Sequence, residues 1–417
     1  MPFSLRSISF AILLVVPSAT LRSDDWPSWR GPSKNGVASS DAPVRWSAET
    51  NVVWRASIPG RGHSSPVVSR NLVVLTSADE KKKRQFVLAL DRTTGKLVWQ
   101  REVAKGDLAP EIHSKNTHAT PTVAASAQRF FAVFPHRASL TLAALSRRGS
   151  IEWKIQAGPH EPKKYRFGYA ASPVLYGSNV LVTSEFEGGF LAAFDRATGK
   201  QTWRVERAGK VNFSTPVIAT TGGREQLLIS GRSLVSSLNP ASGELLWTVP
   251  GMWDVTCGTM IWDDARVYAS GGYPRSGTMA VESNGSRRVV WTKSVKCYEQ
   301  SMLIYEGHIY AVADSGVVYC WRATDGAEKW KQRLKGRLSA SPVLAGGKIY
   351  VTNEKGTTFV LKANPTAFEQ LAVNQLGDET FASFAVCGGQ VFLRAASRDG
   401  GRRRETLYCL GESIPPR

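Results

Sequence analysis

The chain has 417 residues, a mass of 45.5 kDa and a hydrophobic fraction of 42%, which excludes a largely disordered protein. Its 53 Lys and Arg against 34 Asp and Glu give a formal charge of +19, which favours acidic partners. The five cysteines form no C-x-x-C pair, so the sequence does not support a zinc ribbon, a thioredoxin-type redox motif or c-type haem attachment.

The N-terminus has the pattern of a secretory signal peptide. Arg6 provides a positive charge, residues 10–16 are apolar, and Ser18 and Ala19 are the small residues that precede cleavage. We assign the signal to residues 1–20 and expect an exported protein, periplasmic or secreted, although the cleavage site is not defined. No later segment is apolar enough to span a membrane. Residues 21–50 form a lead-in segment.

A turn followed by a strand that ends in Trp recurs along the chain. It occurs as Asp91 to Trp99, Asp195 to Trp203 and Asn239 to Trp247, with Gly at the fifth position each time. Asp or Asn bonds its own backbone in tight turns, and Gly tolerates positive φ. We interpret the Trp side chains as packing between repeated units.

A second signature is Ser or Thr, then Pro and Val, at the start of a strand. Matching positions are Pro66, Pro121, Pro173, Pro216 and Pro342, with degenerate copies at Thr259, Met302 and Phe384. Their mean spacing is about 45 residues, the period of a four-stranded propeller blade. The sequence therefore predicts an all-β fold, an eight-bladed β-propeller of four-stranded blades.

The two ends of the chain complement each other. The first unit reads as four strands: 65–68, 71–76, 85–90 and 96–103. The last has only three: 381–386, 390–395 and 405–410. Residues 51–57 have the pattern of the missing strand, so we expect the N-terminal strand to complete the last blade and close the ring. The propeller then spans residues 51–411, with a C-terminal tail at 412–417.

These repeats resemble the PQQ-like propeller repeat of the quinoprotein alcohol dehydrogenase-like superfamily, over about residues 24–411. The opening Asp25-Trp26-Pro27-Ser28-Trp29-Arg30-Gly31-Pro32, followed by Pro59 to Pro66, also resembles exported bacterial proteins grouped with the outer-membrane assembly lipoprotein BamB. That resemblance implies a BamB-like, non-catalytic scaffold that presents a loop-rich face to an envelope protein or an anionic polymer.

The same superfamily implies an alternative, a PQQ-dependent oxidoreductase that uses Ca²⁺. Such enzymes commonly carry an adjacent Cys-Cys pair and clustered calcium ligands; the chain lacks the pair, and no such ligand cluster can be placed. We therefore expect no cofactor and favour a protein that is not an enzyme, because kinship of fold alone does not carry function.

Candidate ligand-binding residues come from the repeat register. Three residues before each Pro-equivalent position, the chain should face the mouth of the central channel, which places His63, His118 and Glu299 there. Another enzyme using these three residues remains an alternative, but hydrated channel side chains are the favoured interpretation.

The first two connections between blades are longer than the others and should lie beside the channel mouth. They carry Glu111, His113 and Asn116 in the loop over 103–117, and His160, Tyr165 and Arg166 in the loop over 155–169. A metal site built from Glu111, His113, His118 and His63 is the less favoured interpretation, and we assign no metal.

Three further expectations concern the surface and the cysteines. A carbohydrate-binding propeller is an alternative function and would use Trp26, Trp29 or Trp253. Cys257 and Cys297 precede inner strands of adjacent blades and are a candidate disulfide. We expect a monomer that binds no nucleic acid, since no module for such binding is present.

Overall fold

The computed structural model describes residues 25–109, 111–207, 209–252, 255–273 and 275–412. About 51% of the structure is strand, and the described residues contain no helix, hence no helix that could cross a membrane. The predicted signal peptide over residues 1–20 and nearly all of the tail lie outside these ranges.

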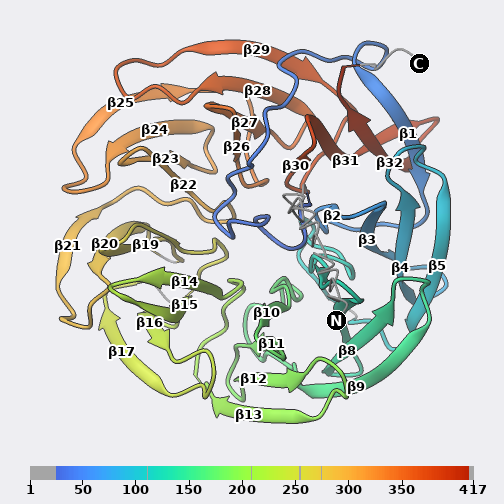
Figure 1. Cartoon of the computed structure of the whole chain (residues 1–417), viewed down its shortest axis with the longest axis horizontal. Coiled ribbons are helices and arrows are strands. Elements are labelled where there is room, and N and C mark those ends of the chain that lie inside the picture. Colours follow the sequence, from blue (N-terminus) through green and yellow to red (C-terminus); the bar gives the residue numbers. More distant parts are fainter. Residues whose placement is uncertain (1–24, 110, 208, 253–254, 274, 413–417) are drawn as a thin grey trace, which may run out of the picture.

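The strands form eight antiparallel sheets of four, arranged as blades around a central axis (Figure 1). This confirms the predicted eight-bladed propeller. Blade 1 contains β2 (Val67–Ser69), β3 (Leu72–Asp79), β4 (Arg84–Asp91) and β5 (Leu97–Lys105); blade 2 contains β6 (Ala124–Ala125), β7 (Arg129–His136), β8 (Ser139–Ser146) and β9 (Ile151–Pro159); blade 3 contains β10 (Val174–Tyr176), β11 (Asn179–Ser184), β12 (Phe190–Asp195) and β13 (Gln201–Glu206); blade 4 contains β14 (Val217–Thr221), β15 (Arg224–Gly231), β16 (Leu234–Leu238) and β17 (Leu245–Pro250).

The remaining blades follow the same order from the axis outward, except that the last takes its outer strand from the N-terminus. Blade 5 contains β18 (Ile261–Trp262), β19 (Arg266–Gly271), β20 (Gly277–Glu282) and β21 (Val289–Lys293); blade 6 contains β22 (Leu303–Tyr305), β23 (His308–Val312), β24 (Val317–Arg322) and β25 (Glu328–Arg333); blade 7 contains β26 (Val343–Ala345), β27 (Lys348–Thr352), β28 (Thr357–Lys362) and β29 (Gln370–Gln375); blade 8 contains β30 (Ala385–Cys387), β31 (Gln390–Asp399), β32 (Arg402–Leu410) and β1 (Val52–Ile58).

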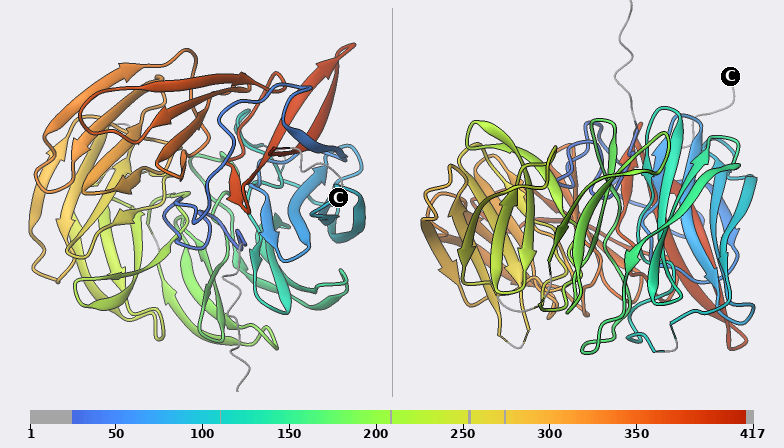
Figure 2. Two further views of the ribbon diagram at one scale, coloured as in Figure 1. Left: turned by 45° about the horizontal axis from the view of Figure 1, so that its top comes forward. Right: turned by 90° about the horizontal axis from the view of Figure 1, so that it is seen from below.

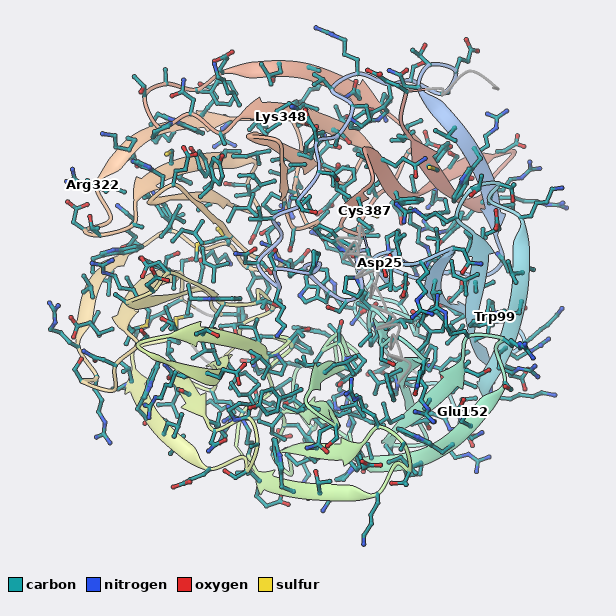
Figure 3. All side chains as sticks on the ribbon, viewed as in Figure 1. Asp25, Trp99, Glu152, Arg322, Lys348 and Cys387 are labelled. Carbon is teal, nitrogen blue, oxygen red and sulfur yellow. The ribbon has the colours of Figure 1, made fainter. Side chains whose placement is uncertain are left out.

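Burial follows position within each blade. The two middle strands are buried on both faces because each sheet packs between two neighbouring sheets, and β3 and β4 accordingly read as nearly continuous apolar runs. Outer strands are largely exposed: Leu97 and Val98 of β5 lie open to solvent, and Trp99 lies at the perimeter in Figure 3.

The ring closes as predicted. β1 pairs antiparallel with β32, from Val52 opposite Leu410 to Ile58 opposite Glu405. A buried ion pair reinforces the closure: Arg394 on β31 lies 2.5 Å from Glu405 on β32, and each side chain is 2% exposed. Arg394 also donates to the carbonyl of Thr76 in blade 1, at 2.7 Å. The first and last blades are thus joined by strand pairing and by a buried charge network.

The repeated Trp residues join most blades to the next, although the outer strand of blade 7 has none. Trp54 on β1 packs against Gly95 in blade 1, where an added Cβ would lie 2.5 Å from the indole, and its Nε1 donates to the carbonyl of Arg92 at 2.9 Å. Gly95 has a φ of 70°, which favours glycine. The same pairing joins Trp99 to Gly149 in the next blade. The structure confirms that these Trp side chains pack between blades.

The two faces of the propeller carry different loops, because the order in which the chain connects its strands determines the face on which each loop lies. Each inner strand begins at the face that carries the loops 106–117 and 160–169, which we call the mouth face. Inner strands end at the opposite face, which the lead-in segment crosses, and which we call the lead-in face. In the edge-on view of Figure 2, cyan and green loops project from one face of the disc and the blue lead-in lies toward the other.

The lead-in segment packs against the propeller through backbone bridges and buried side chains. Trp26 bridges to Val68 of blade 1, the indole of Trp29 donates to Thr259 of blade 5, and Val37 bridges to Leu344 of blade 7, so residues 26–37 cross the propeller axis (Figure 1). Arg30 is 3% exposed and donates to the carbonyls of Met302 and Pro342 at 2.6 and 2.7 Å. Burial lowers the pKa of Arg30 to about 9. This segment closes the central channel at the lead-in face.

Candidate functional site

A ring of hydroxyl side chains encircles the axis and sets the true repeat register. In seven places a backbone N–H of one blade donates to a Ser or Thr hydroxyl of the next, at 2.9–3.1 Å. The residues of this hydroxyl ring are Ser65, Thr122, Ser172, Thr215, Thr259, Ser301, Ser341 and Ser383. Each ring residue directly precedes the Pro-equivalent position of its blade.

This ring corrects two of the predicted anchors. In blade 2 the Pro-equivalent position is Val123 and not Pro121, and in blade 5 it is Met260 and not Thr259. Sequence matching favoured Pro121 because its proline is the repeat's strongest marker, yet the chain forms its cross-blade bond two residues later. The channel position of blade 2 therefore belongs to Thr120, and His118 is displaced from it.

Beside the ring, a cavity of about 200 Å³ occupies the channel. Trp29 lies at the lead-in end of this channel pocket, and its indole nitrogen donates to Thr259 at 2.8 Å, filling the position where the hydroxyl ring lacks a bond. At the mouth end, all eight corrected channel positions line the cavity: His63, Thr120, Ala170, Phe213, Cys257, Glu299, Ser339 and Phe381. The pocket is therefore blind at one end and open at the mouth face.

His63 lies at the channel position predicted for it. Its ring stacks on Phe381, with centroids 4.5 Å apart, and its Nε2 atom is buried without a hydrogen-bond partner among the described residues. Burial, followed by the nearby Arg61, holds the pKa of His63 well below its usual value. A neutral imidazole therefore faces the pocket.

Glu299 also lines the pocket, as predicted. Burial raises the pKa of its carboxyl group above the usual range, and Lys115 lies 3.8 Å away. Lys115 comes from the 106–117 loop and forms a closer pair with Glu354, at 2.5 Å. The pocket wall thus combines one buried acid with a cation that already has acidic partners.

His118 does not reach the pocket. One ring nitrogen is 3.1 Å from Glu80 and the other is 2.9 Å from the carbonyl of Ala109. Burial opposes its charged form, but these two acceptors outweigh it and raise the pKa of His118. The predicted convergence of His63, His118 and Glu299 is therefore wrong for His118, because its side chain anchors the 106–117 loop.

The long loops build the rim of the pocket. His113 and Asn116 line the cavity, and Asn116 donates to the carbonyl of Phe167 in the second loop at 2.6 Å. Phe167 stacks on Phe213 with centroids 6.0 Å apart. Glu111 points outward, 74% exposed, with Arg166 as its neighbour. Among the described residues no group of three or more His, Cys, Asp or Glu side chains is placed to hold a metal ion, so the suggested four-residue metal site is not assembled.

The predicted surface tryptophans have other roles. Trp26 is 1% exposed and belongs to the core of blades 8 and 1, so it cannot bind a ligand at the surface. Trp29 lies at the closed end of the channel pocket. Trp253 lies outside the described residues.

Cys257 and Cys297 are free thiols in different environments, so the candidate disulfide is not formed. Cys257 lines the channel pocket, whereas Cys297 is buried in the core between blades 5 and 6. Burial raises the pKa of both thiols, that of Cys297 to about 12. Their order along the chain suggested adjacency, but the two side chains belong to different layers.

Sequence reasoning missed Lys115, Tyr298 and Trp29 as pocket residues. Lys115 depends on how its loop folds back, which no local pattern reveals. The register error, in contrast, had an available signal, because a Ser or Thr directly before the Pro-equivalent position recurs in every blade.

Comparison with known proteins places the chain in a family. A family model described as outer membrane protein assembly factor BamB matches residues 37–188, 83–328 and 302–366. Two curated relatives with that description, from Alkalilimnicola ehrlichii and Moranella endobia, are each 24% identical, over 156 and 282 residues. The matches cover 34% and 65% of this chain, and 40% and 69% of the respective relatives, so the chain spans under half of the first.

Solved structures support the fold. BamB from Moraxella catarrhalis superposes with a TM-score of 0.63 at 17% identity, covering 88% of this chain and 98% of that one. Quinohemoprotein alcohol dehydrogenase from Comamonas testosteroni gives 0.64 at 13% identity, covering 94% and 82%. At these identities the likeness is one of fold alone.

Proposed function

This chain belongs to the BamB family of outer membrane protein assembly factors, and from that membership we propose that it is a non-catalytic binding scaffold of the cell envelope. Its mouth face holds the partner, which is a protein or an anionic polymer. The relatives' name supports an envelope role, and the signal-like N-terminus supports export to the periplasm or the exterior.

The observation that carries this proposal is the asymmetry of the two faces. On the lead-in face, a strap of buried residues crosses the axis and is held by backbone bridges. On the mouth face, two long loops contact each other through Asn116 and Phe167 and surround an open pocket. Insertions gathered on one face of a repeat fold commonly form its binding face.

Charge adds to this argument. Three of the chain's five basic runs lie at mouth-face turns or loops: residues 81–84 between β3 and β4, residues 163–164 in the second long loop, and residues 402–404 beside the β31–β32 turn. The other two, residues 147–148 and 287–288, lie at lead-in-face turns. With a formal charge of +19 on the whole chain, such a face attracts acidic surfaces, although the attraction weakens with salt.

Quinoprotein enzymes share this fold and use pyrroloquinoline quinone, a planar tricarboxylate, together with calcium. The residues of the channel pocket can therefore be compared with what this cofactor needs. The channel pocket does not fit it. Lys115, the lysine at the pocket, is already paired with Glu354 at 2.5 Å, and the Glu299 carboxyl would face the carboxylates of the quinone. The described residues contain no group of three His, Cys, Asp or Glu side chains placed to hold the calcium ion. These features support a scaffold that acts without this cofactor.

Site-specific photo-cross-linking tests the proposal. A benzoylphenylalanine at Arg166, 61% exposed on the mouth face, is compared with one at Arg148 in an exposed turn of the lead-in face. In cells that make the full chain, we expect a discrete adduct in the envelope fraction from position 166 and none from position 148. Equal labelling at both positions, or recovery of the chain in the cytoplasm, would contradict the proposed function.

A further inference from the structure

The channel pocket offers hydrogen-bond donors that the protein itself does not use. Six residues of the hydroxyl ring line it: Ser65, Thr122, Ser172, Thr215, Ser341 and Ser383. Each hydroxyl oxygen accepts a backbone N–H from a neighbouring blade, and none of the six donates to an acceptor elsewhere in the described residues. Since a hydroxyl group has one donor proton and two acceptor sites, six protons remain available to a ligand.

Aromatic rings line the mouth end of the same pocket. Phe381 stacks on His63, and Phe213 stacks on Phe167, at centroid distances of 4.5 and 6.0 Å. Tyr298 also lines the cavity. Flat apolar faces above a ring of hydroxyl donors match a ligand with an apolar ring face and many oxygen atoms. A sugar ring is such a ligand, and a cavity of about 200 Å³ accommodates one ring.

A second cavity of about 530 Å³ opens beside the pocket on the mouth face, and the two share Lys115 and Phe381. We call it the basic groove. Its three carboxylates already have partners: Glu354 pairs with Lys115, Glu379 with Arg403, and Glu80 with His118.

Three further cations line the groove without a salt bridge among the described residues. Arg61, Lys355 and Arg398 line it, and none has a carboxylate within ion-pair distance in the described part of the chain. The Nε atom of Arg61 is buried without a hydrogen-bond partner there. The groove therefore carries excess positive charge directly next to the neutral, aromatic pocket, which favours a ligand with acidic groups close to its terminal ring.

We propose that the channel pocket binds the terminal sugar ring of an acidic polysaccharide, whose carboxylate or sulfate groups lie in the basic groove against Arg61, Lys355 and Arg398. The ligand enters end-on because the lead-in closes the far end of the channel at Trp29. This inference rests on the proposed function, in which the mouth face holds the partner, and it names the chemical class of that partner.

Titration calorimetry on the purified full chain tests the proposal with three tetrasaccharide probes: tetragalacturonate, a sulfated chondroitin fragment and neutral cellotetraose. We expect saturable one-to-one binding of at least one acidic probe at 150 mM salt, with the neutral probe at least about 10-fold weaker. Comparing the two acidic probes distinguishes carboxylate from sulfate as the recognised group.

Variants separate the pocket from the groove. Phe381→Ala should weaken binding about 10-fold or more by removing the stacking surface, and Arg398→Gln should weaken it about 5-fold. Arg287→Gln removes an equal charge from an exposed turn on the lead-in face and is the matched control, with no change expected. A thermal melt of each variant shows whether it is folded. Glu299→Gln is a nearly isosteric second pocket variant: the acidic groups lie in the groove, so Glu299 faces the sugar hydroxyls, and replacing a carboxylate acceptor with an amide should weaken binding.

Three results would overturn the proposal: no acidic probe binds, Arg287→Gln weakens binding as much as Arg398→Gln, or an acidic peptide binds equally well and Phe381→Ala has no effect. The second result would reduce the interaction to general charge attraction, and the third would indicate a peptide ligand. A specific cross-link from Arg166 alongside any of these results would leave the scaffold function standing and refute only the saccharide site.

Discussion

Breaking the ion pair at the ring closure should destabilise the whole propeller. Arg394 and Glu405 are each 2% exposed and lie 2.5 Å apart. The substitution Glu405→Leu keeps a side chain of similar size but removes the carboxylate, so the guanidinium of Arg394 remains buried without its counter-charge. Removing one partner of a buried pair typically costs about 3–5 kcal/mol.

The structure places this variant at the lower end of that range. Arg394 would keep its bond to the Thr76 carbonyl at 2.7 Å and longer contacts with Ser64 and Ser77 at 3.3 Å. Arg403, which also pairs with Glu405 at 3.1 Å, would keep its pair with Glu379. We therefore expect a loss of about 3 kcal/mol in the free energy of unfolding. With an unfolding entropy of about 2.1 cal/mol/K per residue, that loss lowers the Tm of a chain this long by roughly 3–4 °C.

Thermal melts and urea titrations of three variants test this reasoning. Asp399→Asn is the matched control in the same blade, since Asp399 and Arg404 are 69% and 66% exposed at 3.1 Å and their pair should contribute under about 1 kcal/mol. The double variant Arg394→Met with Glu405→Leu should recover most of the loss, because no charge is left buried. The reasoning is refuted if Glu405→Leu costs no more than Asp399→Asn, or if the double variant is less stable than Glu405→Leu.

Three further predictions concern other parts of the fold. Gly95→Ala should lower the free energy of unfolding by about 2–4 kcal/mol, since Gly95 has a φ of 70° and a Cβ there would meet Trp54 at 2.5 Å. Gly307 has a φ of 71° but open space around it, so Gly307→Ala should lower the free energy of unfolding by only about 1 kcal/mol in the same urea titration. Burial lowers the pKa of His160 to about 4, so its neutral form stabilises the fold fully above pH 6.5, and that contribution, on the order of 2–3 kcal/mol, is lost as pH falls toward 4. His160→Gln should flatten stability across that window, and an unchanged pH profile would contradict the assignment. Alkylation of the denatured, unreduced chain should add five groups by mass, since no disulfide joins the described cysteines, whereas three added groups would show that a disulfide forms.

Local patterns predicted the blades well because propeller repeats encode their turns directly. The Asp91 side chain accepts from the backbone and hydroxyl of Thr94 at 2.8 Å, which fixes the turn before Trp99 as the D-x-x-T-G pattern implies. The missing outer strand of the last unit could be assigned to residues 51–57 for a similar reason, since a sheet requires a partner whose alternation matches.

The candidate site was predicted only in part. His63 and Glu299 lie where the register placed them, whereas His118 does not, because proline marks the repeat less faithfully than the hydroxyl that bonds the next blade. The proposed Cys257–Cys297 bond failed for a related reason: distance along the chain does not report which layer of a blade a side chain enters.

The sequence by itself determined the number of blades, their strand order and the closure of the ring, because turn chemistry and alternation act between residues close in the chain or along one strand. Only the tertiary structure decided which end of the central channel is closed and which residues form its open rim. The strap through Trp29 and Arg30 closes one end, and loops anchored by His118 form the rim at the other. The contacts of the strap join residues far apart in the chain, Trp29 with Thr259 and Arg30 with Pro342, so geometry and burial, and not sequence spacing, decide which side chains meet.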